Sequence, residues 1–162
     1  MESASEAAVS PAQIPVPRRP QPNSRDARRR RKMSGDPYNL DRFITAQAGG
    51  VYEQALAELT TGLKTSHWMW FIFPQHRDLG RSSTARFYGL SGIDEAVAYA
   101  AHPLLGERLR SCCRATLPHL LNEPADNVLG PIDALKLRSS MEIFSESVPG
   151  EKLFRDVLVA IR

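Results

Sequence analysis

The sequence predicts an all-α protein: a compact single-domain helical fold preceded by a disordered N-terminal tail. Two observations predict the helices. Apolar residues recur at helical spacing along most of the chain, and no stretch shows the sustained alternation that indicates a β-strand. A third observation predicts the tail, because the first 35 residues are rich in proline and arginine and have almost no periodic apolar pattern.

The expected tail covers residues 1–35 and contains five prolines, at positions 11, 15, 17, 20 and 22. Such a composition cannot bury enough apolar surface to offset the entropy lost on ordering. Met33 opens the foldable sequence, so we expect it to be the true start of translation. The competing interpretation takes the basic run Arg28–Lys32 as a nuclear localisation signal or a nucleic-acid tether.

Residues 36–162 are expected to form the helical domain. Asp36 and Pro37 resemble an N-cap followed by proline at the first helical position. Leu40, Phe43 and Gln47 then share one helical face up to a Gly-Gly stop. Further helices are expected at 51–61, 84–89, 93–101, 103–118, 132–145 and 153–161, the fourth of these ending or bending at Pro118. The pattern breaks off at Arg162, so we expect a C-terminal piece to be missing.

Charge is divided unevenly along the chain. Residues 1–35 carry eight basic and three acidic side chains, whereas residues 36–162 carry 13 basic and 15 acidic ones. The body therefore has no positive excess with which to bind a phosphate backbone, so nucleic acid is an unlikely partner except through the tail. No apolar run approaches the ~18 residues of a membrane span. We expect a cytoplasmic monomer that does not bind membranes, or a nuclear one if the basic tail is real.

Cysteine and histidine offer little chemistry. Cys112 and Cys113 are neighbours and the only cysteines, so we expect neither a disulfide framework nor a zinc cluster. The four histidines lack paired ligand spacing. No phosphate-binding glycine loop or nucleophile motif is present. The sequence therefore predicts no metal and no cofactor.

The run SHWMWFIFPQ, residues 66–75, is the first candidate site. A segment that is apolar all round is buried as a helix or as a strand, which favours a central core element. The competing interpretation is a pocket, because His67 and Gln75 stand at the two ends, where core meets surface. Trp68 and Trp70 would then form an aromatic wall.

The second candidate is IDALKLRSSMEIF, residues 132–144. On a helix, Asp133, Lys136 and Ser140 share a face that borders the buried stripe rather than opposing it. Burying either charge alone is costly, so the two should pair with each other or with the rest of the domain. A structural ion pair and a functional polar cluster both fit. By contrast, the pairs Glu53/Glu58 and Asp94/Glu95 are expected to be solvated charges.

Four segments resemble the DUF1810 (Rv1873-like) family. They are DPYNLDRFITAQ, SHWMWFIFPQ, GRSSTARFYGLSGIDEAVAYAAHPLLGERL and DALKLRSSMEIF. The resemblance covers about Asp36 to Arg162 and implies an all-helical domain, but no established activity.

A weaker similarity links the chain to NADAR (YbiA-like) proteins, which act on N-glycosidic bonds of ADP-ribose-type compounds. It implies an unknown nucleotide- or nucleoside-like ligand, with the tryptophan rings stacking on a base. It also implies that Gln47, Asp133, Lys136 and Ser140 bind ribose and phosphate, and that a carboxylate stabilises the charge on the sugar. With the two ends of the aromatic run added, the expected ligand-binding residues are Gln47, His67, Trp68, Trp70, Gln75 and Ser140, and the expected catalytic residues are Asp133 and Lys136. Whether the protein hydrolyses such a bond stays open. The alternative is a non-catalytic interaction module whose polar cluster only fixes helix packing.

Overall fold

The structure is a computed structural model that describes residues 35–161. The expected tail up to residue 34, with its basic run and Met33, lies outside the described residues. Within the described chain every regular element is helical, which confirms the predicted all-α class. The nearest approach to a sheet is one isolated bridge between His76 and Leu90.

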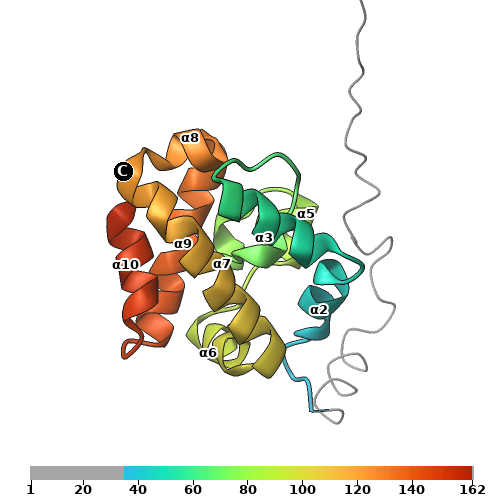
Figure 1. Cartoon of the computed structure of the whole chain (residues 1–162). Helices are drawn as coiled ribbons and strands as arrows, with labels where there is room; N and C mark the ends of the chain where they lie inside the picture. Colours follow the sequence, from blue (N-terminus) through green and yellow to red (C-terminus); the bar gives the residue numbers. More distant parts are fainter. Residues whose placement is uncertain (1–34, 162) are drawn as a thin grey trace, which may run out of the picture.

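The helices follow one another closely along the chain (Figure 1). They are α2 (Asp41–Gln47), α3 (Val51–Thr61), α4 (Met69–Ile72), the 3₁₀ turn η2 (Arg77–Leu79), α5 (Ser83–Phe87), α6 (Ile93–Ala101), α7 (Pro103–Asn122), α8 (Ala125–Leu129), α9 (Pro131–Ser147) and α10 (Lys152–Ala160). None of these helices is long and apolar enough to cross a membrane.

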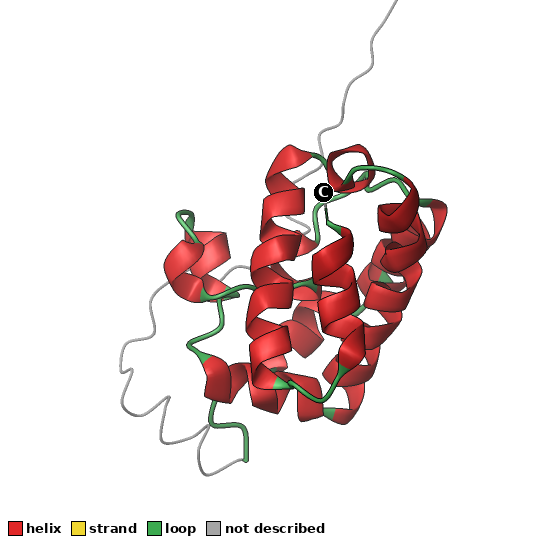
Figure 2. Cartoon of the chain, turned by 90° about the vertical axis from the view of Figure 1, so that its left-hand side faces the viewer, coloured by secondary structure: helices red, strands yellow, loops and turns green. Residues whose placement is uncertain are grey.

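Helix α7 is the axis on which the domain is built. It runs between α10 on one side of the molecule and α2 on the other (Figure 1) and packs on α3, α6 and α10. Helix α9 packs in turn on α6, α8 and α10. A view rotated by 90° about the vertical axis shows these helices side by side, with their connecting loops at the ends (Figure 2). The amphipathic faces expected from the sequence are thereby buried against one another.

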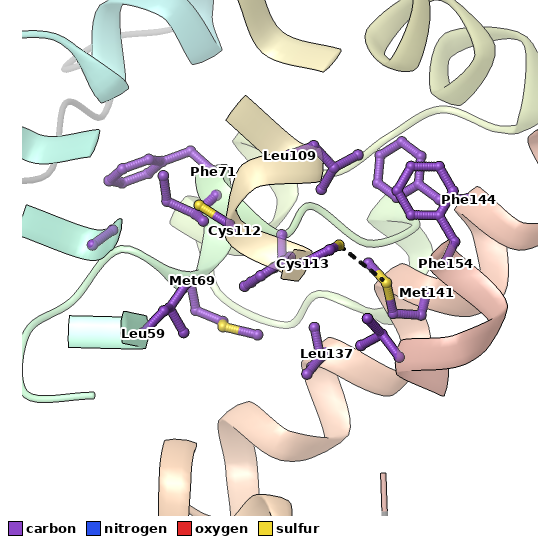
Figure 3. Close-up of a cluster of buried hydrophobic side chains, with 14 of the residues drawn as sticks. Leu59, Met69, Phe71, Leu109, Cys112, Cys113, Leu137, Met141, Phe144 and Phe154 are labelled. Atoms are coloured by element: carbon purple, nitrogen blue, oxygen red, sulfur yellow. Dashed lines mark hydrogen bonds between the residues drawn. The ribbon is translucent and has the colours of Figure 1, made fainter. Parts of the chain in front are cut away.

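The core gathers side chains from five helices. Residues from α3, α4, α7, α9 and α10 converge around Cys113, whose thiol lies 3.7 Å from the sulfur of Met141 (Figure 3). Cys112 and Cys113 are both fully buried and unpaired. The stripe expected on the 132–144 segment is also here, because Leu137, Met141 and Phe144 are inaccessible to solvent.

Several helix boundaries differ from expectation by one or more residues, and two of the differences have a clear structural cause. The first helix begins at Asp41 because Asn39, with φ of 54°, interrupts the helical backbone. Asp36 instead caps this turn by accepting hydrogen bonds from the N–H groups of Leu40 and Asp41. Helix α7 continues past Pro118 to Asn122. Pro118 is exposed, so the carbonyl it leaves without a donor can face water.

Gly62 turns the chain sharply at the end of α3, as its position predicted. Its φ of +87° lies in the left-handed region, and its N–H bonds back to the carbonyls of Glu58 and Leu59. A Cβ here would stand 2.6 Å from the ring of His119. Glycine is therefore required both by the backbone conformation and by the neighbouring side chain. The turn leads into residues 63–68, the segment before α4.

The carboxylate of Glu58 fixes that segment. It accepts hydrogen bonds from Gln54 on its own helix, from the N–H groups of Thr65 and Ser66, from the Ser66 hydroxyl and from the indole of Trp68, at 2.5–3.0 Å. The residue is only 5% exposed. The expectation of a solvated Glu58 was therefore wrong, because donors from the following loop fold back over it.

Glu95 was also expected at the surface, and this too was wrong. Its carboxylate forms a 2.7 Å ion pair with Arg42 and accepts two hydrogen bonds from Ser91. The guanidinium of Arg42 also donates to the carbonyls of Phe87 and Gly89. The pair ties α2 to α6 across 53 positions in sequence, so no local pattern could indicate it.

The Glu58 network predicts a loss of stability in acid. Burial opposes ionisation, but the hydrogen bonds from Ser66, Gln54, Thr65 and Trp68 outweigh it and lower the pKa from 4.5 to about 2. A carboxyl whose pKa is lower in the folded state stabilises the fold fully above pH 4.5. This contribution, at most about 3 kcal/mol, is lost as the pH falls towards 2. Glu58→Gln should lower the free energy of unfolding at pH 7 by roughly 2–4 kcal/mol and flatten its dependence on pH below 5.

Chemical denaturation at pH 7, 4 and 3 measures both effects. Glu53→Gln is the matched control, because Glu53 is an exposed carboxylate on the same helix. An unfolding free energy of Glu58→Gln that keeps the wild-type dependence on pH would contradict the assignment.

Burial of Cys112 and Cys113 predicts that their thiols react slowly with disulfide reagents. Burial raises the pKa of the Cys112 thiol to about 12 and that of Cys113 well above its usual value, so neither forms a thiolate near neutrality. We expect an aromatic disulfide reagent at pH 8 to label both cysteines in guanidinium, but neither at an appreciable rate in native buffer. Fast labelling of either thiol in the native protein would show that this part of the core opens readily.

Candidate functional site

The candidate site is a pocket of about 350 Å³ between the segment before α4 and the start of α9. Its walls come from three places in the chain: Lys64 and His67 from the segment, Met69 and Trp70 from α4, and a third group from the α8–α9 junction. That third group is Leu129, Gly130, Pro131, Ile132, Asp133 and Lys136. Both stretches singled out in the sequence thus contribute to one cavity.

The junction that forms one wall depends on Gly130. Its φ of +88° and ψ of 154° suit glycine, and Pro131 follows at the first position of α9. The carbonyl of Val128, just before it, accepts a 2.8 Å hydrogen bond from the N–H of Lys64. This backbone contact holds the segment before α4 against α8, so that residues 64 and 133 meet.

Asp133 lies at the centre of the charged groups. One carboxylate oxygen is 2.8 Å from the ammonium of Lys64, and the other is 3.6 Å from that of Lys136. The side chains of Asp133 and Lys136 are 19% and 22% exposed, whereas that of Lys64 is 8% exposed. Asp133 also stands in the first turn of α9, where a negative charge is favoured by the helix dipole.

Each lysine also lies over a tryptophan ring. The ammonium of Lys64 is 5.0 Å from the ring centre of Trp68, and that of Lys136 is 4.9 Å from the ring centre of Trp70. Such cation–π contacts add about 0.5–2 kcal/mol each. They orient the two lysines on either side of the same carboxylate.

The two tryptophans have different environments. Trp68 is 1% exposed and its indole N–H donates to Glu58, so the structure places it in the core rather than on the pocket wall. Trp70 is only half-buried and lines the pocket. Trp70 therefore contributes an aromatic side chain to the pocket wall, with the ammonium of Lys136 over its ring.

The remaining predicted residues divide in the same way. His67 is exposed at the pocket edge. Gln47 is buried, and its amide donates to the Phe71 carbonyl and to the hydroxyl of Tyr99. Ser140 is fully buried and its hydroxyl has no partner among the described residues. Gln75 lies away from the pocket, where its carbonyl accepts a hydrogen bond from the N–H of Leu90.

Sequence reasoning missed Lys64, the cation nearest to Asp133. It stands in an irregular segment, where helical periodicity carries no information. The available signal was indirect: Asp133 beside a buried stripe required a counter-charge, and Lys64 lies two residues before the run 66–75. In residues 35–161, no group of three or more His, Cys, Asp or Glu side chains is placed to hold a metal ion.

A larger hollow of about 610 Å³ lies between α7 and α10, lined mainly by apolar side chains including Leu117, Leu121 and Val159. None of the predicted site residues lines it. Lys152, Arg155 and Asp156 also line it, but no aromatic side chain of residues 35–161 does, in contrast to the pocket at Trp70.

Comparison with known proteins agrees with the fold. The family model described as "Protein of unknown function (DUF1810)" matches residues 37–161. A crystal structure at 1.38 Å of the conserved hypothetical protein Rv1873 from Mycobacterium tuberculosis is 42% identical in sequence, with a TM-score of 0.74. The match covers 78% of this chain and 89% of that one. The comparison with curated proteins finds no similar chain. On the family match and this identity, the chain belongs to the DUF1810 family.

Proposed function

We propose that the protein binds a small nucleoside- or nucleotide-like ligand in the pocket between α4 and the start of α9. The observation that carries the proposal is the position of Trp70. Its half-buried ring shares a cavity with the carboxylate of Asp133 and the ammonium of Lys136. A volume of about 350 Å³ falls within the range of small-molecule sites.

The residue types fit such a ligand part by part. A base or nicotinamide-like ring can stack on an indole, which is worth about 1–3 kcal/mol. The apolar side chains of Met69, Leu129 and Ile132 enclose the same space. Asp133 can accept hydrogen bonds from sugar hydroxyls through lone pairs that its two lysines leave free. A purely aliphatic ligand would leave these charges unsatisfied.

Hydrolysis of an N-glycosidic bond is the catalytic form of this proposal. Water would add to the sugar C1′ while the C1′–N bond breaks, and the proton lost by the water would end on the departing base. Asp133 would stabilise the positive charge that develops on the sugar. Because two ammonium groups already neutralise Asp133, the geometry supports binding better than it supports this second step.

A non-catalytic interaction module is the alternative function, and the apolar hollow between α7 and α10 favours it. The two functions require different surfaces. Ligand binding depends on α4 and α9, whereas a protein contact at the hollow depends on side chains such as Leu121 and Val159, which are 62% and 80% exposed.

Titration of the full chain with adenosine, AMP, ADP-ribose and NAD tests the proposal. We expect at least one compound to change the tryptophan fluorescence saturably and to raise the melting temperature. Trp70→Leu should weaken that binding about tenfold or more, because the stacking surface is lost. Tyr52→Leu is the matched control, since Tyr52 is a half-buried aromatic residue on α3 that does not line the pocket.

The absence of a response to all four compounds, or equal weakening by Tyr52→Leu, would overturn the proposal. Release of free base from ADP-ribose-type compounds, measured by chromatography, tests the catalytic form separately. That activity should disappear in Asp133→Asn.

A further inference from the structure

The charges that line the Trp70 pocket do not balance. Two lysines and one aspartate line it, which leaves one positive charge if His67 is neutral. The surrounding domain has the opposite sign, because residues 36–162 carry two more acidic than basic side chains. A local positive excess within an acidic domain is an arrangement that attracts an anion to one place.

The two lysines do not contribute equally. The ammonium of Lys64 is 2.8 Å from Asp133, donates a 2.6 Å hydrogen bond to the Ser66 carbonyl, and is nearly buried. Its positive charge is paired with Asp133, and its N–H groups already bond within the protein. Lys64 is thus a positioning residue that holds Asp133 and the segment before α4 together.

Lys136 keeps most of its binding capacity. Its single ionic contact, at 3.6 Å from Asp133, is longer than a hydrogen bond, and its other contact is with the face of Trp70. Among the described residues its ammonium donates no hydrogen bond. An ammonium has three N–H donors, so an oxyanion in the pocket would meet a cation that is held in place but not saturated.

The start of α9 adds to this preference. No side chain caps the helix at Gly130, and the helix runs for 17 residues from Pro131. The uncapped N-terminus of a helix favours negative charge beside it. Lys136 lies one turn into the same helix and faces the same pocket.

We infer that the ligand of this pocket carries an anionic group, a phosphate or a carboxylate, and that Lys136 binds it. The inference rests on the proposed function and narrows its substrate class. The site should prefer a nucleotide to the corresponding nucleoside, with the ring against Trp70 and the anion on Lys136. The anion takes the free donors of Lys136, and Lys64 continues to neutralise Asp133.

The test compares adenosine, AMP and adenosine 5′-carboxylic acid by isothermal titration on the full chain. We expect AMP to bind at least tenfold more tightly than adenosine, and its advantage to shrink between 50 and 500 mM NaCl. Lys136→Gln should abolish the advantage, so that AMP and adenosine bind with similar affinity. Lys136→Arg should keep it. The carboxylate compound shows which anionic group the site prefers. A site specific for phosphate should bind it more weakly than AMP, whereas a general anion site should bind both with similar affinity.

Lys152→Gln is the matched control, because Lys152 is a 79% exposed lysine on α10, also paired with an aspartate. It should leave both affinities unchanged. Equal binding of adenosine and AMP to the wild type, or an equal loss of both in Lys136→Gln, would overturn the inference and leave the proposed function standing. If the wild type binds none of the three, the inference is overturned, and the proposed function falls with it only if ADP-ribose and NAD also fail to bind. Circular dichroism and melting curves of each variant verify that it is folded.

Discussion

The site depends on the buried carboxylate of Glu58. A buried carboxylate without partners is so costly that the chain must supply donors, and most of them come from the segment that follows α3. The bonds to Thr65, Ser66 and Trp68 leave that segment little freedom. Because the indole of Trp68 is drawn inward to Glu58, Trp70, two residues later at the start of α4, is left to face the pocket. One acidic side chain thereby decides which tryptophan is structural and which is accessible.

A series of charges extends this constraint across the domain. Glu58 fixes the segment that carries Lys64, Lys64 holds Asp133 at 2.8 Å, and Asp133 lies beside Lys136 on α9. Removal of Lys64 would leave Asp133 partly buried with only its longer contact to Lys136, which is costly. Apolar residues of similar size would often pack here at no loss of stability. Under the proposed function, this polar cluster at the edge of the core serves binding rather than stability.

Local patterns predicted the helices and half of the site. The spacing of apolar residues indicated α3, α6 and α9 because each helix buries one face. It could not distinguish Trp68 from Trp70, since every side chain of that run is apolar and the difference lies in a bond to Glu58. Nor could it place Lys64, or Arg42 against Glu95, because those partners are brought together only by the packing of whole helices. Asp133 and Lys136 were found because they share a helix and border its buried stripe.

In the proposed site, the two lysine–tryptophan pairs would allow Lys136 to leave Asp133 for a bound anion at little cost in free energy. Lys64 over Trp68 and Lys136 over Trp70 flank the same carboxylate at similar distances from their rings. Only Lys64, the lysine of the first pair, is largely inaccessible to a ligand, because it is nearly buried and in short contact with Asp133. An anion that takes the donors of Lys136 stretches a contact that is already 3.6 Å long, while Asp133 keeps its nearer cation. Asp133 therefore keeps an ion pair when an anion binds to Lys136. The proposed ion pair with the ligand would then not be offset by the cost of an unpaired buried carboxylate.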